Sequence, residues 1–134
     1  MTEMRPIKEG LHSERDGLTQ SLIGAAIEVH RILGPGLLES IYEEALCHEL
    51  GLRGTKFERQ KPVDVVYKSV VIKGQRLDLL VEDVLIVEIK SVSTLPEVAM
   101  AQVLSYLRAT RLKRALLINF GERLLKDGIK RISV

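Results

Sequence analysis

The amino-acid sequence predicts an α+β fold in which helices flank a central mixed β-sheet, in the order helix, helix, three strands, helix, strand and a last edge strand. Three observations support it. Apolar residues recur at helical spacing in the first part of the chain, whereas several later segments are apolar runs of strand length. Turn signals rich in glycine, proline or acidic residues separate these segments. With 134 residues, the chain should form one domain.

Two helices are predicted in the first third of the chain. Residues 1–16 are polar and aperiodic, so we expect a flexible arm there and a single domain over 17–134, with Asp16 as the first N-cap. The first helix should end at the Gly-Pro-Gly of residues 34–36, and the second should span Leu37–Leu50. Its predicted packing stripe is Leu38, Ile41 and Ala45, and its other face carries Glu39, Tyr42, Glu43 and Leu46.

Three strands are predicted in the middle of the chain. Thr55–Tyr67 is extended and interrupted by Pro62, which suits an edge because proline lacks an N–H. Val70–Val81 and Val84–Val92 are then joined at Glu82-Asp83, the clearest hairpin in the chain.

One helix and two strands complete the fold. Residues 94–97, Thr-Leu-Pro-Glu, resemble a capping box with a proline in the first turn, so a third helix is expected to run to Thr110. Ala115–Asn119 is an apolar strand, and Gly128–Val134 is a last, edge-like strand.

Composition narrows the classes of protein. Hydrophobic residues make up 46% and charged residues 28%, as in soluble globular domains. No apolar run approaches the roughly 18 residues of a membrane span, and the N-terminus does not look like a signal peptide. One cysteine, Cys47, excludes an internal disulfide, so we expect a cytoplasmic protein. The formal charge of +2 permits a polyanionic partner without arguing for one.

Glu88-Ile89-Lys90 follows the apolar run of residues 84–87 and is the most informative motif. Side chains two apart on a strand point the same way, so Glu88 and Lys90 should share a face. Burying charge costs several kcal/mol unless it is paired or binds a metal, which calls for a functional reason. The alternative is a solvated ion pair on an exposed strand face.

Asp78 lies on the preceding strand, and the hairpin register decides whether it meets Glu88. A two-residue turn would pair Val81 with Val84 and set the carboxylates on opposite faces. An odd-length connection or a β-bulge would instead give a pair such as Leu80 with Val84 or Val81 with Leu85 and bring the two acids together. We predict the odd register.

Together these groups suit a hard divalent cation. Mg²⁺ takes oxygen ligands and is held by one or two carboxylates, so Asp78, Glu88 and the carbonyl of Ile89 form a suitable ligand set. The Lys90 ammonium could orient or deprotonate an attacking water or stabilise charge on the transition state. Arg76, two residues before Asp78, could neutralise phosphate; alternatively it is a surface charge.

Several motifs in this order resemble the PD-(D/E)XK nuclease superfamily. They are Asp78, Glu88-Ile89-Lys90 and the Gln102-Val103-Leu104-Ser105-Tyr106 segment of the third helix. Residues 36–42, Gly-Leu-Leu-Glu-Ser-Ile-Tyr, are similar to the signature of the small GxxExxY proteins within that superfamily. The resemblance covers about residues 18–120 and implies a restriction-endonuclease-like core. One departure is Leu77, where the superfamily's name has proline.

The resemblance also implies roles for individual residues. Asp78 and Glu88 would be the metal-binding acids, with Glu39 completing the metal site, and Lys90 would be catalytic. Gln102 would line the site as a catalytic and substrate-binding residue, and the helix would also present Tyr106 to substrate. Tyr42 would contribute to substrate binding from the second helix. Without the resemblance, Tyr42 could be a packing residue and Gln102 a surface amide.

The leading hypothesis is therefore a Mg²⁺-dependent nuclease, with Mn²⁺ as a substitute cation. We expect nucleic acid as partner, DNA in preference to RNA, although no residue distinguishes the two. A homodimer or a helper protein is a further expectation. The alternatives are a non-catalytic accessory protein of the same fold that binds nucleic acid or a protein, and a structural oligomerisation module.

Overall fold

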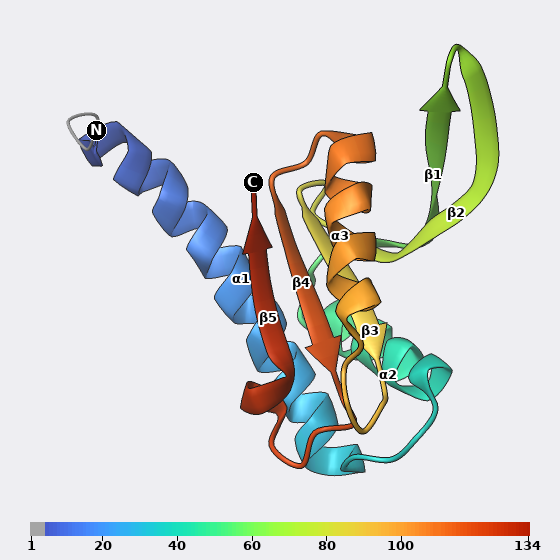
Figure 1. Cartoon of the computed structure of the whole chain (residues 1–134). Coiled ribbons are helices and arrows are strands. Elements are labelled where there is room, and N and C mark those ends of the chain that lie inside the picture. Colours follow the sequence, from blue (N-terminus) through green and yellow to red (C-terminus); the bar gives the residue numbers. More distant parts are fainter. Residues whose placement is uncertain (1–4) are drawn as a thin grey trace.

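The computed structural model describes residues 5–134, with side chains described from Gly17 onward. It confirms the α+β fold: a five-stranded mixed sheet lies between α1 and α2 on one face and α3 on the other (Figure 1). The strand order is β1-β2-β3-β4-β5, with β3 and β4 parallel and the other neighbours antiparallel. The elements are α1 (Arg5–Leu33), α2 (Glu39–Leu52), β1 (Phe57–Tyr67), β2 (Val70–Val81), β3 (Leu85–Lys90), α3 (Glu97–Thr110), β4 (Arg114–Asn119), the short 3₁₀ helix η1 (Leu125–Gly128) and β5 (Ile129–Ser133). No helix in this part of the chain is both long and apolar enough to cross a membrane.

Helix α1 starts earlier than predicted. Residues 1–4 lie outside the described chain, and α1 is already helical at Arg5, so Asp16 lies within the helix and is not its N-cap. The polar sequence of this segment does not oppose a helix, because Pro6 is tolerated in a first turn and most of the other residues are adequate helix formers. The flexibility of the 1–16 arm and the domain limits 17–134 stay predictions.

The two faces of the sheet form separate apolar cores. On β3, Leu85, Val87 and Ile89 face α1 and α2, whereas Ile86 faces α3. Helix α1 contributes Leu22, Ala25, Ala26 and Val29 to the first core, and α3 contributes Ala99, Val103, Tyr106 and Leu107 to the second. Since side chains alternate along a strand, Glu88 falls on the α3 face.

Helix α2 mainly buries a face other than the predicted packing stripe. Of that stripe, Leu38 and Ile41 are 70% and 43% exposed, and only Ala45 packs partly against the first core. The buried residues are instead Tyr42, Glu43, Leu46, Cys47 and Leu50. Glu43 shares the buried face of α2 with four apolar residues. The helix therefore places a carboxylate, as well as apolar side chains, against the sheet.

Tyr42 is a packing residue, and this corrects its predicted role in substrate binding. Its ring is fully buried and stacks on Phe120, with the ring centroids 4.5 Å apart. Its hydroxyl donates to the carbonyl of Gly34 and accepts a 3.1 Å hydrogen bond from the N–H of Leu37. With its donor and an acceptor site used inside the protein, Tyr42 organises the connection between α1 and α2.

Asn119 at the end of β4 ties together the loops that follow β3 and β4. Its Oδ1 accepts hydrogen bonds from the N–H groups of Val92 and Gly121, both at 3.0 Å, and its Nδ2 donates to the Val92 carbonyl at 2.9 Å. A Cβ at Gly121 would lie 2.2 Å from that carbonyl oxygen, so only glycine fits. The clasp fixes the end of β3, where Lys90 lies opposite Asn119.

The start of α3 differs from the predicted capping box. Helix α3 begins at Glu97, and its N-cap is Pro96, which makes no side-chain capping bond. Thr94 therefore lies before the helix, since the extended backbone of Pro96, with ψ of 150°, delays the first turn.

β1 and β2 continue past the body of the molecule as a two-stranded arm (Figure 1). A two-residue turn at Lys68-Ser69, with both φ angles positive, closes it. Apolar side chains near the tip are exposed, including Tyr67 at 60% and Val66 at 68%.

We expect Tyr42→Phe to lower the free energy of unfolding by about 1 kcal/mol, because it removes two buried hydrogen bonds but keeps the stacked ring. Urea denaturation measures this. Tyr67→Phe on the exposed arm is the control and should leave stability unchanged. Equal stability of the Tyr42→Phe and wild-type proteins would contradict the packing role.

Candidate functional site

The β2–β3 hairpin has the odd register that brings Asp78 and Glu88 together. Val81 pairs with Leu85, as predicted. The connection, residues 82–84, has three residues, and its first two have φ angles of 50° and 62°. These left-handed residues form the tight turn, and the third residue shifts the register by one.

Past the last backbone pair of this hairpin, Leu79 with Val87, the carboxylates take over the hydrogen bonds between the strands. The N–H of Asp78 donates to Glu88 Oε2 at 2.7 Å. In return, the N–H of Ile89 donates to Asp78 Oδ2 at 2.8 Å. Each acid thus binds the backbone of the opposite strand, which holds both side chains in the gap between β2 and β3.

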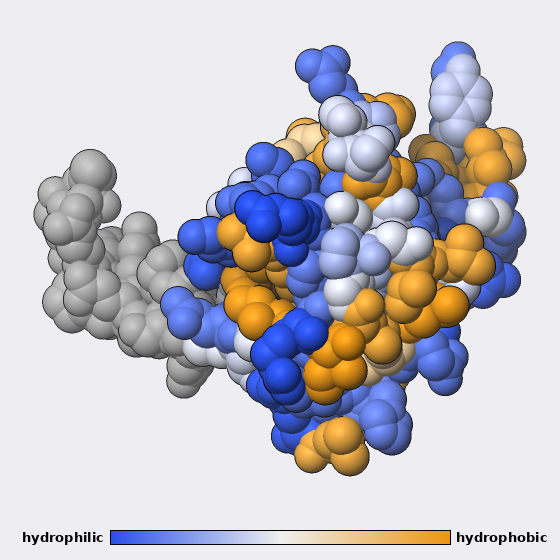
Figure 2. Space-filling model, turned by 90° about the horizontal axis from the view of Figure 1, so that it is seen from below, coloured by the Kyte–Doolittle hydropathy of each residue, from blue (hydrophilic) through white to orange (hydrophobic). Residues whose placement is uncertain are grey.

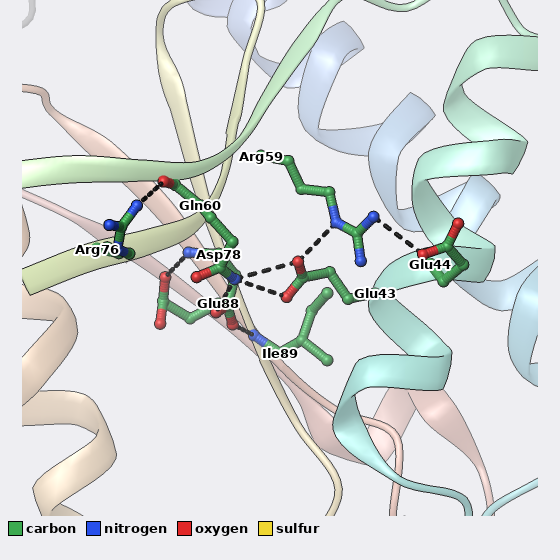
Figure 3. A network of polar contacts seen from close by, with 8 residues as sticks. All are labelled: Glu43, Glu44, Arg59, Gln60, Arg76, Asp78, Glu88 and Ile89. Carbon is green, nitrogen blue, oxygen red and sulfur yellow. Dashed lines mark hydrogen bonds and ion pairs between the residues drawn. The ribbon is translucent and has the colours of Figure 1, made fainter.

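A network of polar contacts connects this pair to α2 (Figure 3). Gln60 Nε2 donates to both oxygens of Glu43, at 3.0 and 3.1 Å, and to Asp78 Oδ1 at 3.4 Å. Arg59 Nε donates to Glu43 Oε2 at 2.8 Å. Glu43 is 8% exposed, so it is a nearly buried acid with both oxygens bound by β1.

Burial and mutual repulsion make the two strand acids resist ionisation. Burial, and then the charge of Asp78, raises the pKa of Glu88 to about 8, although Lys90 lowers it. The pKa of Asp78 is also raised, chiefly by burial and then by the charges of Glu43 and Glu39, against the N–H of Ile89 and the charge of Lys90. The site therefore favours a cation.

Lys90 lies where the motif predicted it, on the same side of β3 as Glu88. It is half-buried, and its charge lowers the pKa of both acids. Within the described chain, no ion pair or hydrogen bond holds its ammonium. The carbonyl of Ile89 points toward β2, because the N–H of the same residue does so in its bond to Asp78.

The two predicted residues of α3 differ in their burial. Tyr106 is 4% exposed and belongs to the second apolar core, and its pKa is raised by burial and then by the charges of Glu88 and Asp78. Gln102, one turn earlier, is half-buried, and its side chain makes no hydrogen bond to a described residue. Gln102 lies on the same helix but outside the hydrogen-bond network.

Arg76 lies at the rim of the site. Its side chain is exposed, and Nη1 donates to the backbone carbonyl of Gln60 at 3.3 Å (Figure 3). It therefore contacts β1 and not the carboxylates.

Glu39 makes no hydrogen bond to either strand acid. It is exposed and lines a groove with the loops that follow β3 and β4; the lining residues are Gly36, Leu37, Leu38, Glu39, Ser91, Val92, Ser93 and Gly121. Figure 2 views the molecule from below and shows apolar patches among hydrophilic side chains. Glu39 acts on Asp78 through its charge, and this effect ranks below that of Glu43.

Three residues of the network, Glu43, Arg59 and Gln60, have no predicted site role. Glu43 carried a signal, because it lies one helical turn after Glu39 on the face that holds Tyr42. Gln60 carried none: its φ of 53° is a left-handed conformation inside a strand, which no local pattern predicts.

The residues present fit a hard divalent cation. The second oxygen of Glu88 has no hydrogen bond to a described residue, and Asp78 Oδ1 has only the long bond from Gln60. The second Glu88 oxygen, Asp78 Oδ1 and the Ile89 carbonyl match the donors that Mg²⁺ prefers. No three acidic, histidine or cysteine side chains of the described chain already converge on one point, and the Gln60 amide lies between Asp78 and Glu43.

We expect the metal-free protein to lose stability as the pH rises from about 4.5 to about 8. The folded-state pKa of Glu88 exceeds its ordinary value, so the folded protein binds more protons than the unfolded protein across this window. Glu88→Gln should flatten the dependence and raise the melting temperature at pH 8. Melting in EDTA at pH 5 and pH 8 tests this, with the exposed Glu58→Gln as control. A pH dependence unchanged in Glu88→Gln would contradict it.

Comparison with known proteins identifies the superfamily of the chain. A family model described as the PD-(D/E)XK nuclease superfamily matches residues 16–132, which contain the two acids and the lysine. No curated protein and no solved structure gave a match. The matched segment covers most of the chain, including the hairpin and both flanking helix layers. The chain therefore belongs to the PD-(D/E)XK nuclease superfamily.

Proposed function

We propose that this protein is a Mg²⁺-dependent nuclease that hydrolyses phosphodiester bonds in nucleic acid. One observation carries the proposal: Asp78 and Glu88 each accept a hydrogen bond from the backbone of the other's strand, Glu88 is buried and Asp78 half-buried, both have raised pKa values, and Lys90 lies on the same face of the strand as Glu88. Neighbouring buried carboxylates destabilise a fold unless a cation offsets them. Membership of the superfamily supports the same class of reaction.

Asp78, Glu88 and the carbonyl of Ile89 would hold the cation, with Mn²⁺ as a substitute. Bound there, Mg²⁺ would supply an acidified water and would stabilise charge on the phosphate. Of the α2 carboxylates, Glu43 has the stronger electrostatic effect on Asp78, so we assign it a closer part in the site than Glu39. Glu39, in the groove, would act through water.

Lys90 would hold the attacking water or the scissile phosphate through its free ammonium. Tyr106, whose pKa is raised by burial and then by the charges of Glu88 and Asp78, would donate a hydrogen bond to a phosphate oxygen. Gln102 and Arg76 would contact the substrate further along its backbone, since neither makes a contact with the acids.

We infer DNA as the substrate in preference to RNA, and a place in the GxxExxY group. Aromatic residues make up only 4% of the chain, so recognition would rest on the phosphate backbone more than on base stacking.

We also infer a cytoplasmic location, consistent with the unpaired, buried Cys47, whose pKa burial raises to about 11. A homodimer or a helper protein stays a proposal.

Asp78→Asn and Glu88→Gln should each weaken Mg²⁺ or Mn²⁺ binding in calorimetry and abolish nicking of plasmid DNA, because each removes one anionic ligand. Asp64→Asn, which alters an exposed acid on the arm, should bind metal and cleave like the wild type. Wild-type protein that neither binds these cations nor cleaves DNA or RNA would exclude the nuclease and favour an accessory protein.

Lys90→Met should lower the cleavage rate by about 100-fold or more while metal affinity and melting temperature stay close to wild type, because the ammonium acts on water or phosphate. Single-turnover cleavage at saturating Mg²⁺ measures the rate. Lys130→Met, on exposed β5, is the matched control. A rate loss that only follows a loss of metal affinity would assign Lys90 to metal binding.

A further inference from the structure

The Gln60 amide occupies the space between two carboxylates from different layers of the fold. Its Nε2 lies 3.0 and 3.1 Å from the Glu43 oxygens and 3.4 Å from Asp78 Oδ1. Figure 3 shows the amide between α2 and the strand acids. An NH₂ group carries partial positive charge and donates two hydrogen bonds, so it stabilises the negative charge of the two carboxylates in part, as a cation would.

The backbone at Gln60 is held in an uncommon conformation. Its φ of 53° falls in the left-handed region, which costs a residue other than glycine, asparagine or aspartate about 1 kcal/mol or more. Neighbouring pairs Arg59 with Leu79 and Lys61 with Leu77 are regular, so the distortion is confined to one residue. Both pairs flank the position where Gln60 would lie opposite Asp78.

We propose that Gln60 is an amide latch of the metal site: it bridges Glu43 and Asp78 in the metal-free protein and must withdraw when a divalent cation binds Asp78. The proposal rests on the proposed metal site and adds a competing residue to it. In this arrangement the amide partly offsets the charge of Asp78. It also makes cation binding weaker than the bare carboxylates would allow.

The competition follows from the donor geometry. Asp78 uses Oδ2 for the N–H of Ile89, so Oδ1 is the oxygen left for a cation, and it is the oxygen that Gln60 contacts. That contact is the longest of the three, so the amide can leave Asp78 while it keeps its two bonds to Glu43. Withdrawal therefore needs only a small movement.

Gln60→Gly tests the latch, because glycine accepts a positive φ and removes only the side chain. We expect it to tighten Mg²⁺ binding about tenfold in calorimetry, which corresponds to the loss of one charge-assisted hydrogen bond. Gln60→Lys should place a fixed ammonium between the acids and abolish Mg²⁺ binding. Lys68→Gly, at a positive φ on the arm, controls for the backbone effect of glycine and should bind like the wild type.

A second readout follows the amide directly. On titration of wild-type protein with Mg²⁺, the side-chain amide ¹⁵N and ¹H signals of Gln60 should shift in parallel with the calorimetric binding curve. If wild type binds Mg²⁺ but Gln60→Gly binds no more tightly and the amide signals stay fixed, the latch is overturned while the metal site stands. If neither wild type nor Gln60→Gly binds Mg²⁺ or Mn²⁺, both the metal site and the latch are overturned.

Discussion

The exchange of hydrogen bonds between Asp78 and Glu88 is the interaction on which the rest of the site depends. The backbone ladder between β2 and β3 stops at Leu79–Val87, and the two carboxylates accept the next N–H groups in place of carbonyls. Because these two side chains bridge the strands, β2 can diverge from β3 while the N–H groups of Asp78 and Ile89 still have hydrogen-bond acceptors. Beyond this bridge, β2 continues with β1 as the two-stranded arm (Figure 1).

Placing these two carboxylates together lowers the stability of the folded protein when both are ionised. Burial and repulsion raise the pKa of both acids, so the free protein holds them at a cost. Three groups reduce this cost from different directions: the N–H groups of the opposite strand, the Lys90 ammonium on the same strand, and the Gln60 amide from β1. Each carries less positive charge than a divalent cation, which is why the proposed function assigns a cation to these acids.

The surrounding fold holds these groups with little freedom. Asn119 and Gly121 clasp the end of β3, and the buried ring of Tyr42 against Phe120 fixes the start of α2. Glu43 follows Tyr42 directly, so the packing of one residue positions the carboxylate of the next. Packing and chemistry are therefore coupled on α2: the helix that closes the first core also carries an acid to the edge of the site.

The sequence by itself determined the order of the elements, the mixed sheet and the acid-lysine motif, because apolar periodicity and strand alternation are local properties. The sequence also showed that the hairpin register decides whether Asp78 lies near Glu88, and the three-residue turn gives the predicted odd register. It did not determine the start of α1, the buried face of α2 or the roles of Tyr42, Glu43 and Gln60. Leu38 and Ile41 made an equally apolar stripe, and only contact with the sheet decides which side of an evenly amphipathic helix is buried. The left-handed Gln60 was decided by tertiary structure alone, since its conformation is stabilised by carboxylates distant in sequence, from α2 and β2.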